Sequence, residues 1–247
     1  MTPEVRDRIQ LARRRGAALL RILKDHLPRE VRTSGAHTDW SVAGPAFIAR
    51  SGRLLDATLR LPDEHEVAAG VLLRVLYEHI ALFCWIAVDP ANHASQWVRM
   101  DRVERLKTGN ELRALGEVLD PQITERYETE RDSTRPWPGL PEMAKAADLH
   151  WAAAGIAAFS ARGLRSMYVV IYRQFSAFVH AMPASLDGVI GKGPAPDISR
   201  VGIEDEPSET NAFTIAPIVF GLGLLVSGKA LGFPEPARID GAFTSTA

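Results

Sequence analysis

The sequence predicts an all-α protein, a single-domain bundle (residues 1–247) of about six to eight helices around a buried central helix. Apolar residues recur at helical spacing in several long segments, and no internal repeat or strand-rich block interrupts them. Three pairs join a helix-capping residue to a proline at the first helical position. These pairs are Thr2-Pro3, Asp89-Pro90 and Asp120-Pro121.

The composition is that of an ordinary globular protein. Of the 247 residues, 46% are hydrophobic and 24% are charged, so the chain can bury a sizeable core. The formal net charge of -1 argues against a protein that coats a phosphate backbone.

The N-terminal helices are expected within residues 1–62. The first, about Pro3 to His26, and the second, about Ala43 to Leu61, are both amphipathic. The third, about Glu64 to Val88, is apolar nearly all round and is therefore predicted to be the central helix. It opens the region of core helices, residues 63–181.

A charged helix and an insertion are expected next. The helix, about Pro90 to Leu119, has a long solvated face and a potential break near Gly109. The insertion, residues 120–160, holds a polar helix at about 121–131 and a short helix at about 142–154. We interpret both as peripheral to the bundle.

Two further core helices are expected in the C-terminal part. The segment from about Leu164 to Ala181 has apolar spacing that fits a buried helix better than a strand. Residues 182–207 contain too many glycines and prolines for regular structure, which predicts a long loop. The last core helix is expected within residues 208–231, at about Glu209 to Ala230.

The cysteine content and the apolar segments bear on location. Cys84 is the one cysteine and lies in an apolar run, so no disulfide within the chain is expected. The charged N-terminus lacks a secretory signal, which favours the cytoplasm. Residues 67–88 contain charged side chains, and residues 212–226 fall short of the roughly 20 needed to cross a bilayer. We expect buried core helices and no membrane partner.

Common catalytic and metal-binding motifs are not found in the sequence. There is no HExxH, CxxC or GxSxG motif. The string from Gly188 to Gly193 is too short for a phosphate loop and lacks its Ser or Thr. We therefore expect no metal site and no cofactor.

Polar residues inside the two most apolar core segments form the candidate site. Arg74 and Glu78 are spaced i, i+4 on the central helix, while Tyr172, Ser176 and His180 follow at i, i+4 and i+8 on the later one. Burial of a charge is costly unless the charge is paired. Packing the two helices face to face would satisfy all five side chains and form one polar pocket for a small polar or anionic ligand.

The residues VLLRVLYEHIALFCWIAVDP, followed later by YRQFSAFVH, resemble an uncharacterised family of bacterial all-helical proteins. Members pair an Arg-x3-Glu helix with a helix that carries Tyr, Ser and His. Arg74, Glu78, Ser176 and His180 match, and Tyr172 matches more loosely. The resemblance covers about residues 45–230 and implies an α-helical fold without naming a reaction.

A second resemblance is to the HEPN superfamily, whose ribonuclease members carry Arg-x4 to x6-His in a helical core. Arg173 and His180 fit this pattern with six intervening residues. The resemblance implies a metal-independent endoribonuclease of the defence or toxin type, assembled at a homodimer interface. His180 would act as general acid or base, and Arg173 would stabilise charge on the phosphate of the RNA.

Three hypotheses therefore stay open from the sequence. The first is a pocket protein that uses Arg74, Glu78, Tyr172, Ser176 and His180. The second is the HEPN-like ribonuclease, and the third is a structural or interaction protein in which these residues form a satisfied network in the core.

Overall fold

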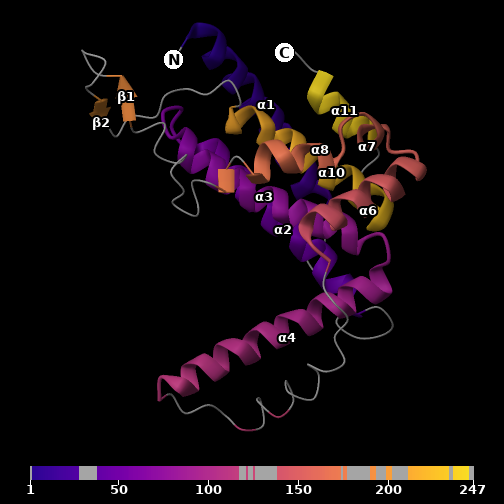
Figure 1. Cartoon of the computed structure of the whole chain (residues 1–247). Coiled ribbons are helices and arrows are strands. Elements are labelled where there is room, and N and C mark those ends of the chain that lie inside the picture. Colours follow the sequence, from indigo (N-terminus) through magenta and orange to yellow (C-terminus); the bar gives the residue numbers. More distant parts are fainter. Residues whose placement is uncertain are drawn as a thin grey trace.

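The computed structural model confirms the all-α class, with helices packed around one central helix (Figure 1). It describes residues 2–27, 38–116, 121, 125, 138–173, 175–176, 190–192, 199–201, 211–233 and 236–244.

The first helix, α1 (Pro3–His26), has the predicted bounds, and the Thr2 side chain caps it by accepting from the Val5 N–H at 3.4 Å. The second, α2 (Thr38–Arg60), begins five residues earlier than expected. Trp40 explains the extra turn because its buried ring stacks on Phe83, with the centroids 5.8 Å apart.

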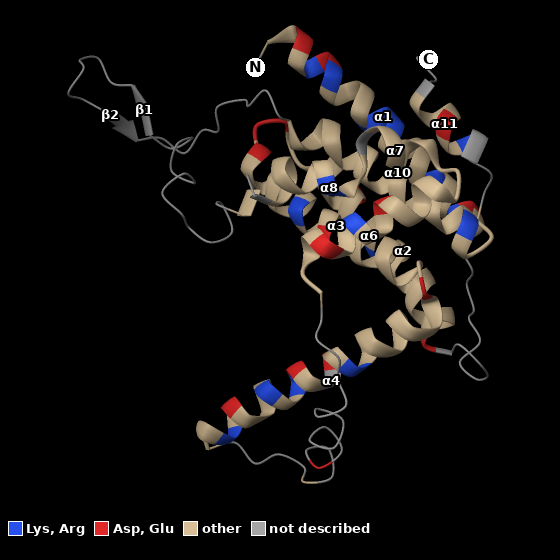
Figure 2. Ribbon diagram, turned by 45° about the vertical axis from the view of Figure 1, so that its right-hand side comes forward, with Lys and Arg blue, Asp and Glu red and all other residues tan. Residues whose placement is uncertain are grey.

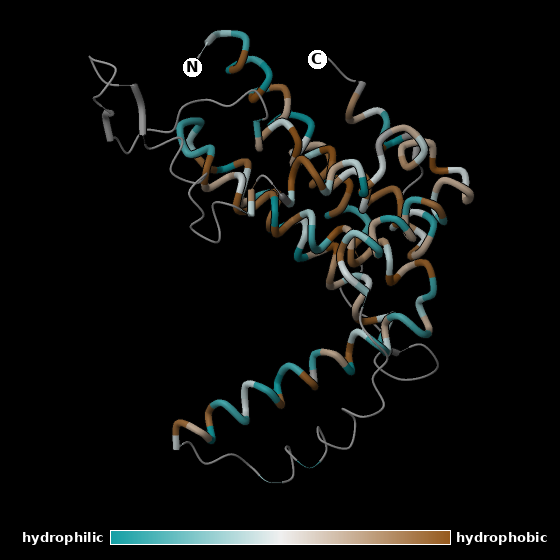
Figure 3. Tube along the Cα trace, in the orientation of Figure 1, coloured by the Kyte–Doolittle hydropathy of each residue, from teal (hydrophilic) through white to brown (hydrophobic). Residues whose placement is uncertain are grey.

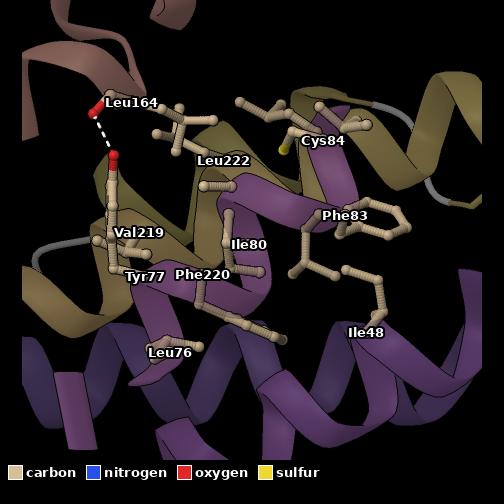
Figure 4. Packing of buried hydrophobic residues seen from close by; sticks show 14 of the residues in the cluster. Ile48, Leu76, Tyr77, Ile80, Phe83, Cys84, Leu164, Val219, Phe220 and Leu222 are labelled. Carbon is tan, nitrogen blue, oxygen red and sulfur yellow. Dashed lines mark hydrogen bonds between the residues drawn. The ribbon is translucent and has the colours of Figure 1, made fainter. Parts of the chain in front are cut away.

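The central helix, α3 (Glu66–Ile86), packs against α2, α4, α6, α10 and η1. Its most extensive packing is with the last core helix, α10 (Ala212–Ala230), where Val219 lies beside Tyr77, and Phe220 and Leu222 lie near Ile80 (Figure 4). A Cβ on Gly223 would lie 2.5 Å from Ile80 Cδ1, so a glycine allows the two helices to approach. The prediction of a buried central helix is confirmed.

Helix α4 (Pro90–Ala114) extends away from the bundle and carries alternating charges (Figures 1 and 2). Ion pairs join Arg105 to Asp101 at 2.7 Å and Lys107 to Glu104 at 2.6 Å. The expected break near Gly109 is wrong, because the helix continues through it. The expected end at 119 is also wrong, because the chain turns at Gly116 with φ of 95°.

Helix α6 (Leu140–Ala153) corresponds to the short helix expected in the insertion, but it packs directly on α3. Met143, Ala147 and Trp151 are buried, and the Trp151 indole N–H donates to the Cys84 carbonyl at 2.9 Å. This helix is therefore part of the core. The polar helix expected at 121–131 lies almost entirely outside the described residues.

The predicted core helix from Leu164 is helical but not uniformly α. It comprises α8 (Leu164–Met167) and a π-helix, η1 (Tyr168–Arg173), and residues 175 and 176 are again α-helical. A π-turn inserts one residue into the helical repeat, a feature that apolar spacing does not reveal. Residues 177–181 lie outside the described part.

Two helices and two strands were not predicted. Helix α7 (Ala157–Arg162) precedes α8, and α11 (Pro236–Thr244) packs on α1 and α10. Strands β1 (Ile190–Lys192) and β2 (Ser199–Val201) form an antiparallel pair with Gly191 opposite Arg200. The expectation of no regular structure in 182–207 is therefore wrong for these six residues, and the rest of that segment lies outside the described residues.

Two helices, α3 and α10, are long and apolar enough to cross a membrane by length and composition (Figure 3). They pack against each other inside the bundle, and many of their apolar residues are fully buried there. This burial is typical of core helices.

Candidate functional site

The Arg74 guanidinium is the centre of a polar cluster that joins α3 to the helix running from Leu164 to Ser176. Arg74 Nε donates to Ser176 Oγ at 3.0 Å, and Nη2 donates to Tyr172 Oη at 3.2 Å. The same Nη2 lies 3.0 Å from Glu78 Oε1. We call Arg74, Glu78, Tyr172 and Ser176 the Arg74 cluster.

Tyr172 contacts Arg74 through its ring as well as its hydroxyl. The guanidinium carbon lies 4.7 Å from the ring centroid, within the range of a cation–π interaction. The Tyr168 ring also stacks on the Tyr172 ring, with 5.1 Å between their centroids. Both tyrosines belong to the π-helix, so the unusual turn of η1 directly positions the aromatic side of the cluster.

The ion pair between Arg74 and Glu78 is only partly exposed. The Arg74 side chain is 11% exposed and the Glu78 side chain 35%. An enclosed guanidinium requires acceptors, and the carboxylate and two hydroxyls supply them. Glu78 opens toward solvent, so the cluster lies at the edge of the core.

The Ser176 hydroxyl behaves differently from three other hydroxyls within the helices. Those of Thr58, Thr108 and Ser227 each donate to the carbonyl four residues earlier, at 2.8 to 3.1 Å. Ser176 instead accepts from Arg74, and no such bond to the Tyr172 carbonyl is formed. Tyr172 Oη also accepts from Arg74, so each hydroxyl retains its own proton to donate, and no acceptor for either proton lies among the described residues.

Three contacts fix the helix that carries Tyr172 and Ser176. Asp148 on α6 accepts from the Leu164 and Arg165 backbone N–H groups at 2.7 and 2.9 Å, which caps α8 from a neighbouring helix. The buried Tyr77 hydroxyl donates to the Leu164 carbonyl at 2.8 Å (Figure 4). Burial raises the pKa of Asp148, and the two N–H groups oppose that shift.

A glycine sets the distance between α3 and the chain at Phe175. A Cβ on Gly70 would overlap the Phe175 ring, so α3 approaches the helix at Phe175 because residue 70 has no side chain. Gly70 lies one turn before Arg74, and Phe175 precedes Ser176. This close approach brings the guanidinium within reach of the serine hydroxyl.

His79 lies beside the cluster but belongs to a separate contact. Its Nδ1–H donates to the Val75 carbonyl at 2.8 Å, and its Nε2 accepts from Arg50 Nε at 2.9 Å. Burial lowers the pKa of His79, and the Arg50 charge lowers it further, so the neutral imidazole is favoured. These contacts make His79 a packing residue outside the Arg74 cluster.

The structure therefore brings together Arg74, Glu78, Tyr172 and Ser176 of the five residues considered for the pocket. His180 lies outside the described residues. Arg173 is the last residue of η1, and its side chain also lies outside what is described. Two cavities lined by described residues lie elsewhere and include no residue of the Arg74 cluster. That the cluster binds a ligand stays a prediction.

Sequence reasoning missed the residues that position the cluster, namely Asp148, Gly70 and Tyr77. Asp148 lies on a different helix from its two backbone partners, and no spacing rule connects them. Gly70 carried a weak signal, since an isolated glycine within an apolar helix often marks a close approach.

Within the described residues, no group of three or more His, Cys, Asp or Glu side chains could hold a metal ion. The donors of the Arg74 cluster are a guanidinium and two hydroxyls, which suit an oxygen acceptor in a ligand rather than a cation.

Fold and cluster together define an all-helical protein with an arginine-centred polar cluster between two core helices. The chain belongs to the family of unknown function DUF5677, whose model matches residues 46–196. The match includes α3 and the helix that carries Tyr172 and Ser176. Comparisons with curated proteins and with solved structures gave no match.

Proposed function

We propose that the Arg74 cluster binds a small polar or anionic ligand. The observation that carries this proposal is the pair of hydroxyls, Tyr172 Oη and Ser176 Oγ, which accept from Arg74 and have protons left to donate. A hydroxyl whose oxygen accepts a hydrogen bond can still donate its own proton to a ligand. A ligand oxygen supplies the acceptor.

The charges of the cluster restrict the ligand. Arg74 supplies a cation, and Glu78 compensates much of that charge at 3.0 Å. A small carboxylate that also carries a hydroxyl or amino group fits best, because its carboxylate can accept from the tyrosine and serine hydroxyls while its donor binds Glu78. Because Glu78 is partly exposed, the hydroxyl or amino group of the ligand would lie on the solvent side of the cluster.

Calorimetric titration with small hydroxy and amino carboxylates, with inorganic phosphate alongside, tests this proposal. A bound compound should raise the melting temperature of the wild type, because it binds only the folded state. Ser176→Ala removes one hydroxyl and should weaken binding about tenfold, the effect of one lost hydrogen bond to a charged group. Tyr172→Phe should act similarly.

A matched control separates binding from general damage. Arg105 forms an i, i+4 ion pair on exposed α4, so Arg105→Met should leave the affinity unchanged, whereas Arg74→Met should abolish binding. Equal affinity in the wild type, Ser176→Ala and Tyr172→Phe would contradict the proposal.

The alternatives predict different results. A HEPN-like ribonuclease would cleave RNA in the presence of a chelator and lose this activity in His180→Ala and Arg173→Ala. A structural network would bind none of the compounds, and substitution of Arg74 or Glu78 would lower stability alone. Within the described residues, no observation favours the ribonuclease over the pocket.

A further inference from the structure

Two cavities lie on either side of α10, away from the Arg74 cluster, and share one wall residue, Ile218. The first, of about 230 Å³, is bounded by α1, α10 and α11 and is lined by Arg8, Arg15 and Phe243. The second, of about 620 Å³, is bounded by α7, α8, η1 and α10 and is lined by Met167, Val170, Ile171, Ile215 and Leu222. The first cavity is lined by two arginines, the second is mainly apolar, and the exposed Ile218 borders both.

The first cavity favours an anion. Arg15 Nη2 donates to the Phe243 carbonyl at 2.8 Å, but Arg15 Nε is buried without a hydrogen-bond partner. Arg8 is exposed two turns earlier on α1 and forms no ion pair within the described part of the chain. Among the described residues that line this cavity none is acidic, so the charges of Arg8 and Arg15 have no acidic partner in that lining.

The second cavity favours a hydrocarbon. Of the described residues that line it, Ser166 alone is polar, and its hydroxyl already donates to the Gly163 carbonyl at 2.8 Å. Its volume is that of a site for a small organic molecule. Val170 and Ile218 are 43% and 44% exposed at its edge, so apolar surface remains in contact with water.

We infer that the two cavities together bind a single-chain amphiphile with an anionic head group, namely a free long-chain carboxylate. The carboxylate binds Arg8 and Arg15, and Arg15 Nε gains its acceptor. The chain crosses Ile218 and fills the apolar cavity. This site shares no residue with the Arg74 cluster, and Met167, Val170 and Ile171 lie on the helix that also carries Tyr172.

Calorimetric titration of the full chain with dodecanoate and with 1-dodecanol, both below their aggregation limits, tests the inference. The two probes share the chain and differ in charge. Dodecanoate should bind the wild type about tenfold more tightly than dodecanol, as one charge-assisted contact provides. Arg8→Gln should remove most of this preference, while Arg14→Gln, an exposed neighbour outside the cavity, should retain it.

The apolar end is tested by filling it. Ala161 is exposed at the cavity wall, so Ala161→Trp can occupy the space without disturbing the core. This variant should weaken both probes at least tenfold, and Arg74→Met should weaken neither. Melting curves of each variant would show that it is folded.

Three results would overturn the inference. Equal affinity for dodecanoate and dodecanol would show that the arginines take no part. Binding to anionic phospholipid vesicles without binding to dodecanoate would indicate a membrane surface instead. A dimer in sedimentation that Ala161→Trp dissociates, without binding of either probe, would show that a second copy of the chain covers this face.

Discussion

At the residue scale, one arginine accounts for most of the polar contacts between α3 and the helix from Leu164 to Ser176. Arg74 bonds a carboxylate and two hydroxyls while its side chain is 11% exposed. Its guanidinium also lies over the Tyr172 ring, which adds a cation–π contact. The same residue therefore contributes to stability and to the proposed site.

Arg74→Met should lower the free energy of unfolding by about 1 to 2 kcal/mol, because three partly buried polar groups lose their partner. Arg105→Met is the matched control, since the Arg105 side chain is 66% exposed and its ion pair is worth about 0.5 kcal/mol or less. Urea unfolding monitored by circular dichroism measures both. Equal losses in the two variants would show that the cluster contributes no special stability.

His79 makes stability depend on pH. Burial lowers its pKa in the folded protein below 6.5, so in the window just below 6.5 the unfolded chain binds a proton that the folded protein does not. Acidification through this window therefore favours unfolding. The free energy of unfolding should fall as the pH is lowered through about 6.5, and His79→Gln should reduce this decline.

The control for this pH dependence is exposed His150 on α6. His150→Gln should leave the decline unchanged, as measured by denaturant titrations at each pH. A decline of the same size in wild type and His79→Gln would exclude His79 as its source.

At the element scale, glycines decide how closely helices pack. Gly70 faces Phe175 and Gly223 faces Ile80, and a Cβ at either position would meet the opposing side chain. Gly241 in α11 has no atom near the position of a Cβ. The same residue type thus has opposite consequences at different positions.

Gly70→Ala should destabilise the protein by about 1 to 3 kcal/mol, since the added methyl forces Phe175 and the neighbouring Ser176 away from α3. Gly241→Ala should instead stabilise it by up to about 1 kcal/mol, because alanine is the better helix former. Thermal unfolding of the two variants and the wild type measures these changes in stability. Stabilisation by both substitutions would mean that the approach at Gly70 is not tight.

The cap at the start of α8 is a second feature at the element scale. Asp148→Ala removes the acceptor for two backbone N–H groups and should cost about 1 kcal/mol. It should also weaken binding of the ligand proposed for the Arg74 cluster, because Tyr172 and Ser176 follow α8 in the chain. Hydrogen exchange of the Leu164 and Arg165 amides measures the loss of the cap, and unchanged protection would argue against this role.

At the scale of the whole molecule, α3 is enclosed by neighbours on most sides, and Cys84 lies within it. Cys84 is fully buried, and burial raises the pKa of its thiol. Since the thiolate is the reactive form, the native protein should not react with Ellman's reagent. Labelling should appear in the same denaturant range as the loss of helical signal. Rapid labelling without denaturant would show that the bundle opens locally around α3.

The sequence by itself determined the fold class and the identity of the central helix. Apolar spacing depends on the helical period, and capping pairs such as Thr2-Pro3 act locally, so both can be interpreted from neighbouring residues. Arg74 and Glu78 on one turn, and Tyr172 and Ser176 on another, were nominated because polar groups in apolar helices need partners. The family model matches residues 46–196, a range that includes all four of these residues.

Only the tertiary structure decided how these parts meet. The π-turn of η1, the cap that Asp148 supplies from another helix and the close approach at Gly70 all depend on contacts between distant segments. The same holds for α6, which looked peripheral in sequence and packs on α3. Local periodicity determines which residues form a helix and which face is apolar, whereas the partner of each face is selected by the packing of the whole chain.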